Sequence, residues 1–368
     1  MSKNISQIPY REITERVREL ARTPENTDEK VRGVIQDVFT REIPSKYDWT
    51  FLLASSGITT IDEYKTGNVS INTGSRSANF SSDVTLTAGM VGRKIKVSGN
   101  DTLYEITSFG GVTSATLLPS YEGETNASNQ SYTIFQPIYA LASDFDRFPK
   151  DGGIYKWSGG RKEILREEPY QEYNTNFSAT PSTPEKVRLA GTDTAGNQLF
   201  EFRPAPKDAK NYGYDYIRSL SPLSETSAGT VTIGADATLV TGHGSVFTEA
   251  RTGDWLRVDA LGIGQDSSWY RVSLITNGTT LTLNTAFANT LVESANYVIS
   301  RAPEYPIKVQ QAVLWGSLRA LAMDQNDQTG AFYHIRFAEV MSDAKRLYAT
   351  RTYSQKIETV AEDFKYRR

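Results

Sequence analysis

Residues 91–97 read Val-Gly-Arg-Lys-Ile-Lys-Val, and residues 252–258 read Thr-Gly-Asp-Trp-Leu-Arg-Val. After the glycine of each stretch, apolar and polar side chains alternate, which is typical of a strand with one face in a core and the other in solvent. The two glycines, Gly92 and Gly253, are 161 residues apart. The similarity of the two stretches indicates an internal duplication.

Three further pairs of anchors follow this duplication in the same order along the chain. Their separations stay between 162 and 166 residues, for Gly67 and Gly229, Tyr104 and Tyr270, and Tyr132 and Tyr297. Each copy covers about seventy residues and contains about five short alternating segments, a size suited to a small β-barrel or sandwich. The sequence therefore predicts two related β modules, at 65–136 and 228–301.

Both ends of the chain carry helical patterns instead. Thr27 is a suitable N-cap, with Asp28 and Glu29 in the first turn of the helix that follows. Apolar residues then recur at helical spacing, at Val31, Val34, Ile35, Val38 and Phe39. We expect this helix to end before Pro44. An earlier stripe at 13–21 and a last helix with Phe337 to Tyr348 on one face have the same periodicity. In the segment 307–323 the apolar residues cover most of the circumference, which suits a helix packed on more than one side.

Two short helical pairs at opposite ends cannot each bury a core, so we expect them to pack together. The predicted class is α+β: a discontinuous helical domain built from 1–64 and 302–368, which encloses the β region. Within that region, 137–227 forms a central β segment between the two modules. This organisation predicts contacts between residues 10–40 and 307–348.

Composition argues against catalysis. Among 368 residues there is no cysteine and there are two histidines, which excludes thiolate chemistry and leaves little for histidine catalysis or metal binding. We expect no enzyme activity, no catalytic residue, no metal and no cofactor. No apolar run approaches the roughly 20 residues that span a bilayer, and the N-terminus lacks an apolar signal stretch, so no membrane partner is expected.

The charge balance disfavours tight nucleic-acid binding. Lys and Arg total 40 against 43 Asp and Glu. None of the regions 1–50, 228–301 and 302–368 has the large surplus of Lys and Arg that a protein needs to neutralise phosphates.

The weak candidates for chemistry are isolated. Asp144 and Asp146 could share one face of a strand and form a carboxylate pair, but a solvated loop is the better interpretation. His334 lies early in the last helix without a partner four residues on, and His243 lies between two glycines in an expected hairpin loop. Tyr104 and Tyr270, with Trp269 alongside, could stack on sugars, although their place in the repeat favours packing.

The layout resembles the head-to-tail adaptor (connector) proteins of tailed bacteriophages, and is similar to podophage tail tubular adaptors. This resemblance is carried by the N-terminal helices with Tyr47-Asp-Trp49 after them, Leu141-Ala-Ser-Asp-Phe145, the segment from Pro181 through Phe202-Arg-Pro-Ala-Pro206 to Tyr216, and the helical pair at 307–348. The two β modules depart from a minimal adaptor and look like insertions.

The resemblance implies a virion protein, assembled in the host cytoplasm, that forms a homo-oligomeric ring of about twelve copies. It implies a portal protein on one face, a tail stopper, nozzle or tail-tube protein on the other, and non-specific passage of viral DNA through the lumen during ejection. It also implies that the C-terminal end, Lys365, Tyr366, Arg367 and Arg368, docks on the portal. The alternative is a glycan-binding or adhesion protein, similar to a tail fibre, that uses the β modules.

Overall fold

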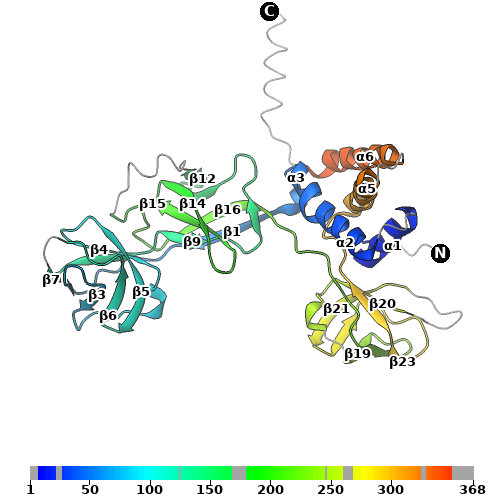
Figure 1. Cartoon of the computed structure of the whole chain (residues 1–368), viewed down its shortest axis with the longest axis horizontal. Coiled ribbons are helices and arrows are strands. Elements are labelled where there is room, and N and C mark those ends of the chain that lie inside the picture. The colour runs from blue at the N-terminus through cyan, green and yellow to red at the C-terminus, as the bar shows by residue number, and fades with distance from the viewer. Residues whose placement is uncertain are drawn as a thin grey trace, which may run out of the picture. The chain divides into compact units, whose positions relative to one another are not determined.

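The computed structural model confirms a mixed α+β fold (Figure 1). It describes residues 7–21, 27–123, 126–167, 180–244, 247–259, 268–324 and 329–349. The chain forms two compact units, Met1–Leu52 with Leu220–Arg368, and Leu53–Ser219. Within the described residues, no helix has the length and hydropathy needed to cross a membrane.

Helices from the two ends of the chain pack on one another in the first unit. Helix α5 (Ile307–Asp324) contacts α1 (Tyr10–Ala21), α2 (Asp28–Asp37) and α6 (Gly330–Tyr348). Of the predicted stripes, Ile13 and Val17 of α1 and Val31 and Ile35 of α2 are buried, whereas Leu20 of α1 is 44% exposed. As predicted, the side chain of Thr27 caps α2, accepting a hydrogen bond from the backbone N–H of Lys30.

The second helix does not end before Pro44, as the sequence suggested. It continues as a π-helical turn, Val38–Glu42, and then as α3 (Ile43–Lys46), where Pro44 occupies the first turn. A first-turn position does not use the backbone N–H that proline lacks. After a 3₁₀ turn, η2 (Thr50–Leu52), the chain leaves this unit, so the helical segment stops at Leu52 and not at residue 64.

The second β module is an eight-stranded sheet in the first unit. Its strand order is β17-β24-β20-β21-β22-β19-β18-β23. The strands are β17 (Glu225–Thr226), β18 (Thr230–Ile233), β19 (Leu239–His243), β20 (Trp255–Val258), β21 (Tyr270–Asn277), β22 (Thr280–Leu283), β23 (Val292–Ala295) and β24 (Tyr297–Ser300), with a 3₁₀ turn, η4 (Phe247–Glu249).

The first β module, in the second unit, has the same topology. Its order is β7-β2-β3-β6-β5-β4-β8, which matches the other sheet strand for strand. The strands are β2 (Val69–Ile71), β3 (Ser77–Phe80), β4 (Lys94–Val97), β5 (Leu103–Gly111), β6 (Ser114–Leu118), β7 (Ala127–Gln130) and β8 (Tyr132–Phe135), with η3 (Ala88–Met90). The place of β17 beside β24 is taken by a single bridge between Tyr64 and Ile134.

Individual contacts repeat as well. The hydroxyl of Tyr132 donates to the carbonyl of Thr66 at 2.6 Å, and that of Tyr297 donates to the carbonyl of Ala228 at 2.7 Å. In each case the acceptor precedes a glycine with positive φ, +71° at Gly67 and +80° at Gly229. The two modules therefore share local hydrogen bonding as well as strand order.

This equivalence predicts matched energetic effects. Tyr132→Phe and Tyr297→Phe should each destabilise their own module by about 1 kcal/mol, because each removes a buried donor from a carbonyl. Hydrogen exchange of the two modules would measure the local change. As a control, Tyr333→Phe should change little, since its 3.4 Å contact with the Leu20 carbonyl is exposed. A loss in one module and none in the other would contradict the equivalence.

Two further sheets form the central part of the second unit. One has the order β1-β16-β11-β12, with β10 also paired to β16, and the other has the order β13-β14-β15-β9. The strands are β1 (Leu53–Thr59), β9 (Ile138–Ala140), β10 (Phe145–Arg147), β11 (Ile154–Ser158), β12 (Arg161–Ile164), β13 (Arg166–Glu167), β14 (Lys186–Thr192), β15 (Gln198–Arg203) and β16 (Asn211–Arg218). Aromatic residues from both sheets, including Phe202 and Tyr214, share one core.

Candidate interaction site in the central sheets

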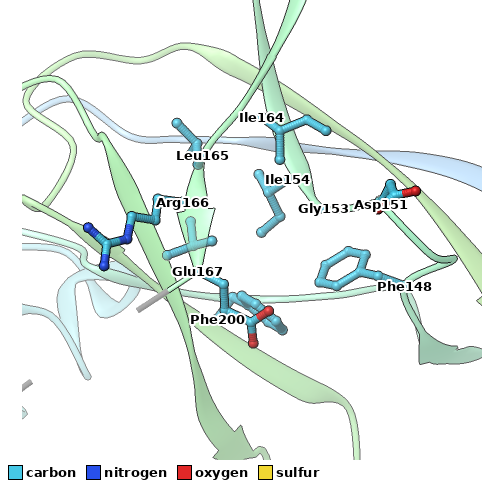
Figure 2. A pocket seen from close by; sticks show the side chains of 11 residues that line it. Phe148, Asp151, Gly153, Ile154, Ile164, Leu165, Arg166, Glu167 and Phe200 are labelled. Atoms are coloured by element: carbon cyan, nitrogen blue, oxygen red, sulfur yellow. The ribbon is translucent and has the colours of Figure 1, made fainter. Parts of the chain in front are cut away.

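A cavity of about 410 Å³ opens at the edge of the central part of the second unit, between β11–β12 and β13–β15 (Figure 2). Two continuous runs, 151–154 and 164–167, line it together with single residues of β14 and β15, and most of these residues are apolar or glycine. The lining residues are Phe148, Asp151, Gly152, Gly153, Ile154, Ile164, Leu165, Arg166, Glu167, Val187 and Phe200. Of the apolar ones, Ile154, Leu165, Val187 and Phe200 are buried.

The polar residues of the cavity lie at its rim. Figure 2 shows Ile154, Phe148 and Phe200 converging, while the guanidinium of Arg166 points away from them. Asp151 and Glu167 supply carboxylates at the rim. Among the described residues, the lining contains no histidine, serine or lysine. A cavity of this size can hold a ligand group or a side chain.

The hairpin β11–β12 borders this cavity and exposes a tryptophan. The side chain of Trp157 is 62% exposed. The register pairs Trp157 with Lys162 and Tyr155 with Ile164, so these four side chains share one face of the hairpin. The two-residue turn is Gly159-Gly160, with φ of +55° and +78°, values that glycine adopts without strain.

A compact set of contacts fixes the base of the hairpin. The ring of Tyr155 lies against Gly213, where an added Cβ would come within 2.6 Å of it. The ammonium of Lys162 lies 4.2 Å from the centre of that ring and donates to Asp215 at 2.8 Å. Burial acts to raise the pKa of Asp215, but the hydrogen bonds from Lys162 and Ser55 outweigh it and lower that pKa. Trp157 is thus held on an ordered strand pair.

The carboxylate pair suggested by the sequence does not form. Asp144 accepts a hydrogen bond from the hydroxyl of Tyr216 at 2.7 Å, while Asp146 pairs with Arg147 at 2.6 Å. Burial, together with the bond to Asp144, raises the pKa of Tyr216 to about 12. The two carboxylates therefore have separate structural partners. Within the described residues, no group of three or more His, Cys, Asp or Glu could hold a metal ion.

The histidines do not come together with other candidate groups. His243 is the last residue of β19, not a loop residue as expected, because that strand pairs with β18 up to Thr230. Its Nε2 lies 3.1 Å from the hydroxyl of Thr232. His334 is exposed on α6.

The aromatic residues of the repeat are packed in place. Tyr104 and Tyr270 are buried, as their repeat positions predicted, and each hydroxyl accepts a backbone N–H eighteen residues on, from Glu122 and Ala288. Trp269 stacks on the guanidinium of Arg257, 4.7 Å from the ring centre. The faces of the two tyrosines are therefore not available to a sugar. The C-terminal residues 365–368, expected to dock on a portal, lie outside the described residues.

Sequence reasoning missed the cavity and Trp157. A Gly-Gly pair between alternating segments was a signal for the hairpin, and would have placed Trp157 beside Lys162. No sequence signal places β14 and β15 against that hairpin, since they follow it by more than twenty residues and belong to another sheet.

An ion-pair cluster in the first unit joins the second β module to the helices. Glu15 on α1 receives two hydrogen bonds from the guanidinium of Arg257 on β20, at 2.9 and 3.1 Å, and one from Arg11 at 2.9 Å. Glu225, on the edge strand β17, pairs with Arg11 at 3.4 Å and also with Arg32 on α2. These contacts fix the module on α1 and α2.

The cluster predicts a pH effect. Hydrogen bonds from Arg257 hold the pKa of Glu15 below its ordinary value of 4.5. The resulting stability is present above pH 4.5 and is lost as the pH falls through the lowered pKa. Glu15→Gln should therefore flatten the fall in unfolding free energy below pH 4.5, measured by urea unfolding from pH 6 to 3. An unchanged slope would show that Glu15 is not responsible for this pH dependence of the unfolding free energy. Glu19→Gln is the control, because the side chain of Glu19 is exposed.

Comparisons with known proteins show no family for this chain. No protein-family model matches, and a search of curated proteins finds no match. Among solved structures, the apo form of translation elongation factor SelB from Methanococcus maripaludis aligns over 70% of this chain and 64% of that chain, with 12% identity and a TM-score of 0.15. The chain thus spans less than two thirds of that structure, and the TM-score is too low to indicate a shared fold.

Proposed function

We propose that this protein is a non-enzymatic structural subunit of a tailed-bacteriophage virion. It assembles into a ring that joins the portal to the tail and surrounds the channel through which DNA leaves the head. The discontinuous helical domain provides the body of the subunit, and the two small β modules are additions to it. We further propose that the ring contains about twelve copies and that it is assembled in the host cytoplasm.

The observation that carries the proposal is the outer side of α6 in the helical domain. Phe332, Ile335 and Leu347 on this helix are 50%, 56% and 48% exposed. Large apolar residues exposed along one helix are typical of a surface that other chains cover. Helix α6 packs on α5, and α5 in turn contacts the N-terminal helices α1 and α2. The exposed apolar face of α6 therefore belongs to a helix that is anchored in the helical domain.

The partners follow from the same proposal. One face of the ring receives the portal protein, and the C-terminal residues 365–368 dock on it. The other face receives a tail stopper, nozzle or tail-tube protein. The nearly balanced charge suits a lumen that lets DNA pass without holding it, because strong phosphate neutralisation would retain it.

The test is assembly and portal capture of the purified full-length chain. Native mass measurement and negative-stain images should show rings of about twelve chains of 40.9 kDa each, and the portal protein should retain the chain. Deletion after Arg351 should weaken that retention. A stable monomer or trimer that binds sugars saturably and ignores the portal would favour the alternative, a glycan-binding adhesion protein.

A further inference from the structure

We infer that Trp157 of one copy inserts into the 410 Å³ cavity of a neighbouring copy of this chain. This contact rests on the proposed function, because it supplies one of the subunit–subunit contacts that a ring requires. The insertion unit, called here the knob, is Trp157 with the turn that follows it. The receiving unit, called the hole, is the cavity between β12 and β13–β15.

The knob has the properties of an interface anchor. An indole that is 62% exposed leaves a large apolar area in water, which costs free energy unless another surface covers it. Tryptophan is also among the residues most enriched at energetically dominant interface positions. The knob is ordered before contact, since Tyr155 packs on Gly213 and Lys162 is held by Asp215. Little conformational freedom is therefore lost when it binds.

The hole matches the knob in size and polarity. Its volume lies within the range of cavities that bind small-molecule groups, and its floor consists of Ile154, Leu165, Val187 and Phe200. Trp157 is not part of the lining of its own cavity. It lies two residues from Tyr155 along β11, and the partner of Tyr155, Ile164, forms part of the wall. Knob and hole are thus neighbouring but separate surfaces of one chain.

Charge at the rim identifies the occupant. Within the described part of the chain, Arg161 at the tip of the knob has no ion pair, and neither do Asp151 and Glu167 at the rim of the hole. A docked knob would bring the guanidinium to these carboxylates. Nucleic acid is a poorer occupant because the lining carries two carboxylates against one guanidinium, that of Arg166, and so has no cationic surplus for phosphate. A second copy of this chain carries the complementary cation beside its exposed indole.

The contact is heterologous, since one surface of each copy meets a different surface of the next. Repetition of such a contact closes a ring when the rotation permits, and otherwise builds a filament. Reciprocal insertion by two copies would produce an isologous dimer instead, and a parent chain that stops at such dimers would contradict the ring.

Complementation in trans tests the contact most sharply. Trp157→Ala removes the knob and keeps the hole, whereas Ile164→Lys keeps the knob and blocks the hole at a position that is 52% exposed. Each variant alone should assemble at least about 30-fold less tightly than the parent by sedimentation velocity. An equimolar mixture should form a heterodimer and nothing larger through this contact, because only the knob of one variant and the hole of the other remain. Leu239→Ala, which removes an equally exposed apolar side chain elsewhere, should assemble like the parent.

Charge exchange provides an independent readout. Arg161→Glu and Glu167→Arg should each weaken assembly, and the double variant should recover much of it. Circular dichroism of each variant would show that folding is retained.

The outcomes separate this contact from the proposed function. Parent rings that persist in the Trp157→Ala variant would overturn the contact and leave the ring function standing. Dimers or filaments that depend on Trp157, without portal binding, would support the contact and contradict the ring function. A parent chain that is monomeric at all concentrations, with and without portal, would overturn both.

Discussion

Trp49→Ala is expected to lower the unfolding free energy of the helical domain by about 4 kcal/mol. Trp49 is fully buried, and its indole N–H donates to the carbonyl of Ile43 at 2.8 Å. It packs between Tyr47, edge-on at 5.1 Å, and Phe51, stacked at 5.4 Å. Alanine would leave a large cavity and an unpaired carbonyl at the end of the π-helical turn.

The loss of stability should also reach the C-terminal end of helix α6, because the segment around Trp49 contacts it. Its backbone bridges Ala349, and the hydroxyl of Thr50 donates to the carbonyl of Tyr348 at 3.0 Å. The cavity would therefore loosen the end of α6 as well as the turn before β1. If α6 carries the apolar surface proposed above, the variant should also assemble poorly.

The measurement is hydrogen exchange of α3 and α6, which reports local stability without assuming two-state unfolding of a two-unit chain. Trp49→Phe is the matched control. It keeps an aromatic ring but removes the indole N–H, so we expect a loss of about 1 to 2 kcal/mol. A change below 1 kcal/mol for Trp49→Ala would contradict the structural role assigned to this residue.

Local periodicity predicted the helices well where one face is buried and the other is solvated. The stripe from Val31 to Phe39 identified α2 and its buried residues. It could not predict the continuation through Pro44, because a π-helical turn has no distinct sequence pattern and shifts the hydrogen bonding by one residue.

The duplication was the most informative sequence feature. Four anchors in order predicted two related modules, and the matched hydrogen bonds of Tyr132 and Tyr297 explain why those tyrosines recur. How each module is attached was not predictable. The position of Lys96 in the first copy is held by Arg257 in the second, and the helical partner of Arg257, Glu15, lies more than 240 residues away.

The candidate contact residues were mostly beyond sequence reasoning. Attention to carboxylates and histidines followed from the chemistry that such groups perform, but Asp144 and Asp146 have structural partners. Trp157 became significant only through its exposed fraction, which depends on which surfaces the two central sheets leave uncovered. Burial of this kind is set by tertiary packing and not by local pattern.

Glu225 on β17 is one of the charged residues that attach the second module to the helices. Its side chain is only 14% exposed and lies between two guanidinium groups, those of Arg11 and Arg32, from different helices. Neutral hydrogen bonds support the same interface, including the amide of Gln36, which exchanges two bonds with the backbone of Leu223. These neutral bonds can hold the edge of the module but cannot neutralise two neighbouring cations.

Glu225→Ala is therefore expected to destabilise the first unit by about 2 kcal/mol, because Arg32 loses its carboxylate partner while Arg11 keeps only its bond to Glu15. Hydrogen exchange should show the loss at β17 and β24 and along α1, while the core around Leu281 stays protected. Glu339→Ala removes one member of an exposed pair with Arg336 and should change stability by less than about 0.5 kcal/mol.

Suppression of the defect by Arg11→Met in the same chain would assign the defect to uncompensated charge, since that substitution removes one of the two cations and keeps a long side chain. A defect that Arg11→Met leaves unchanged would instead assign it to lost packing at β17.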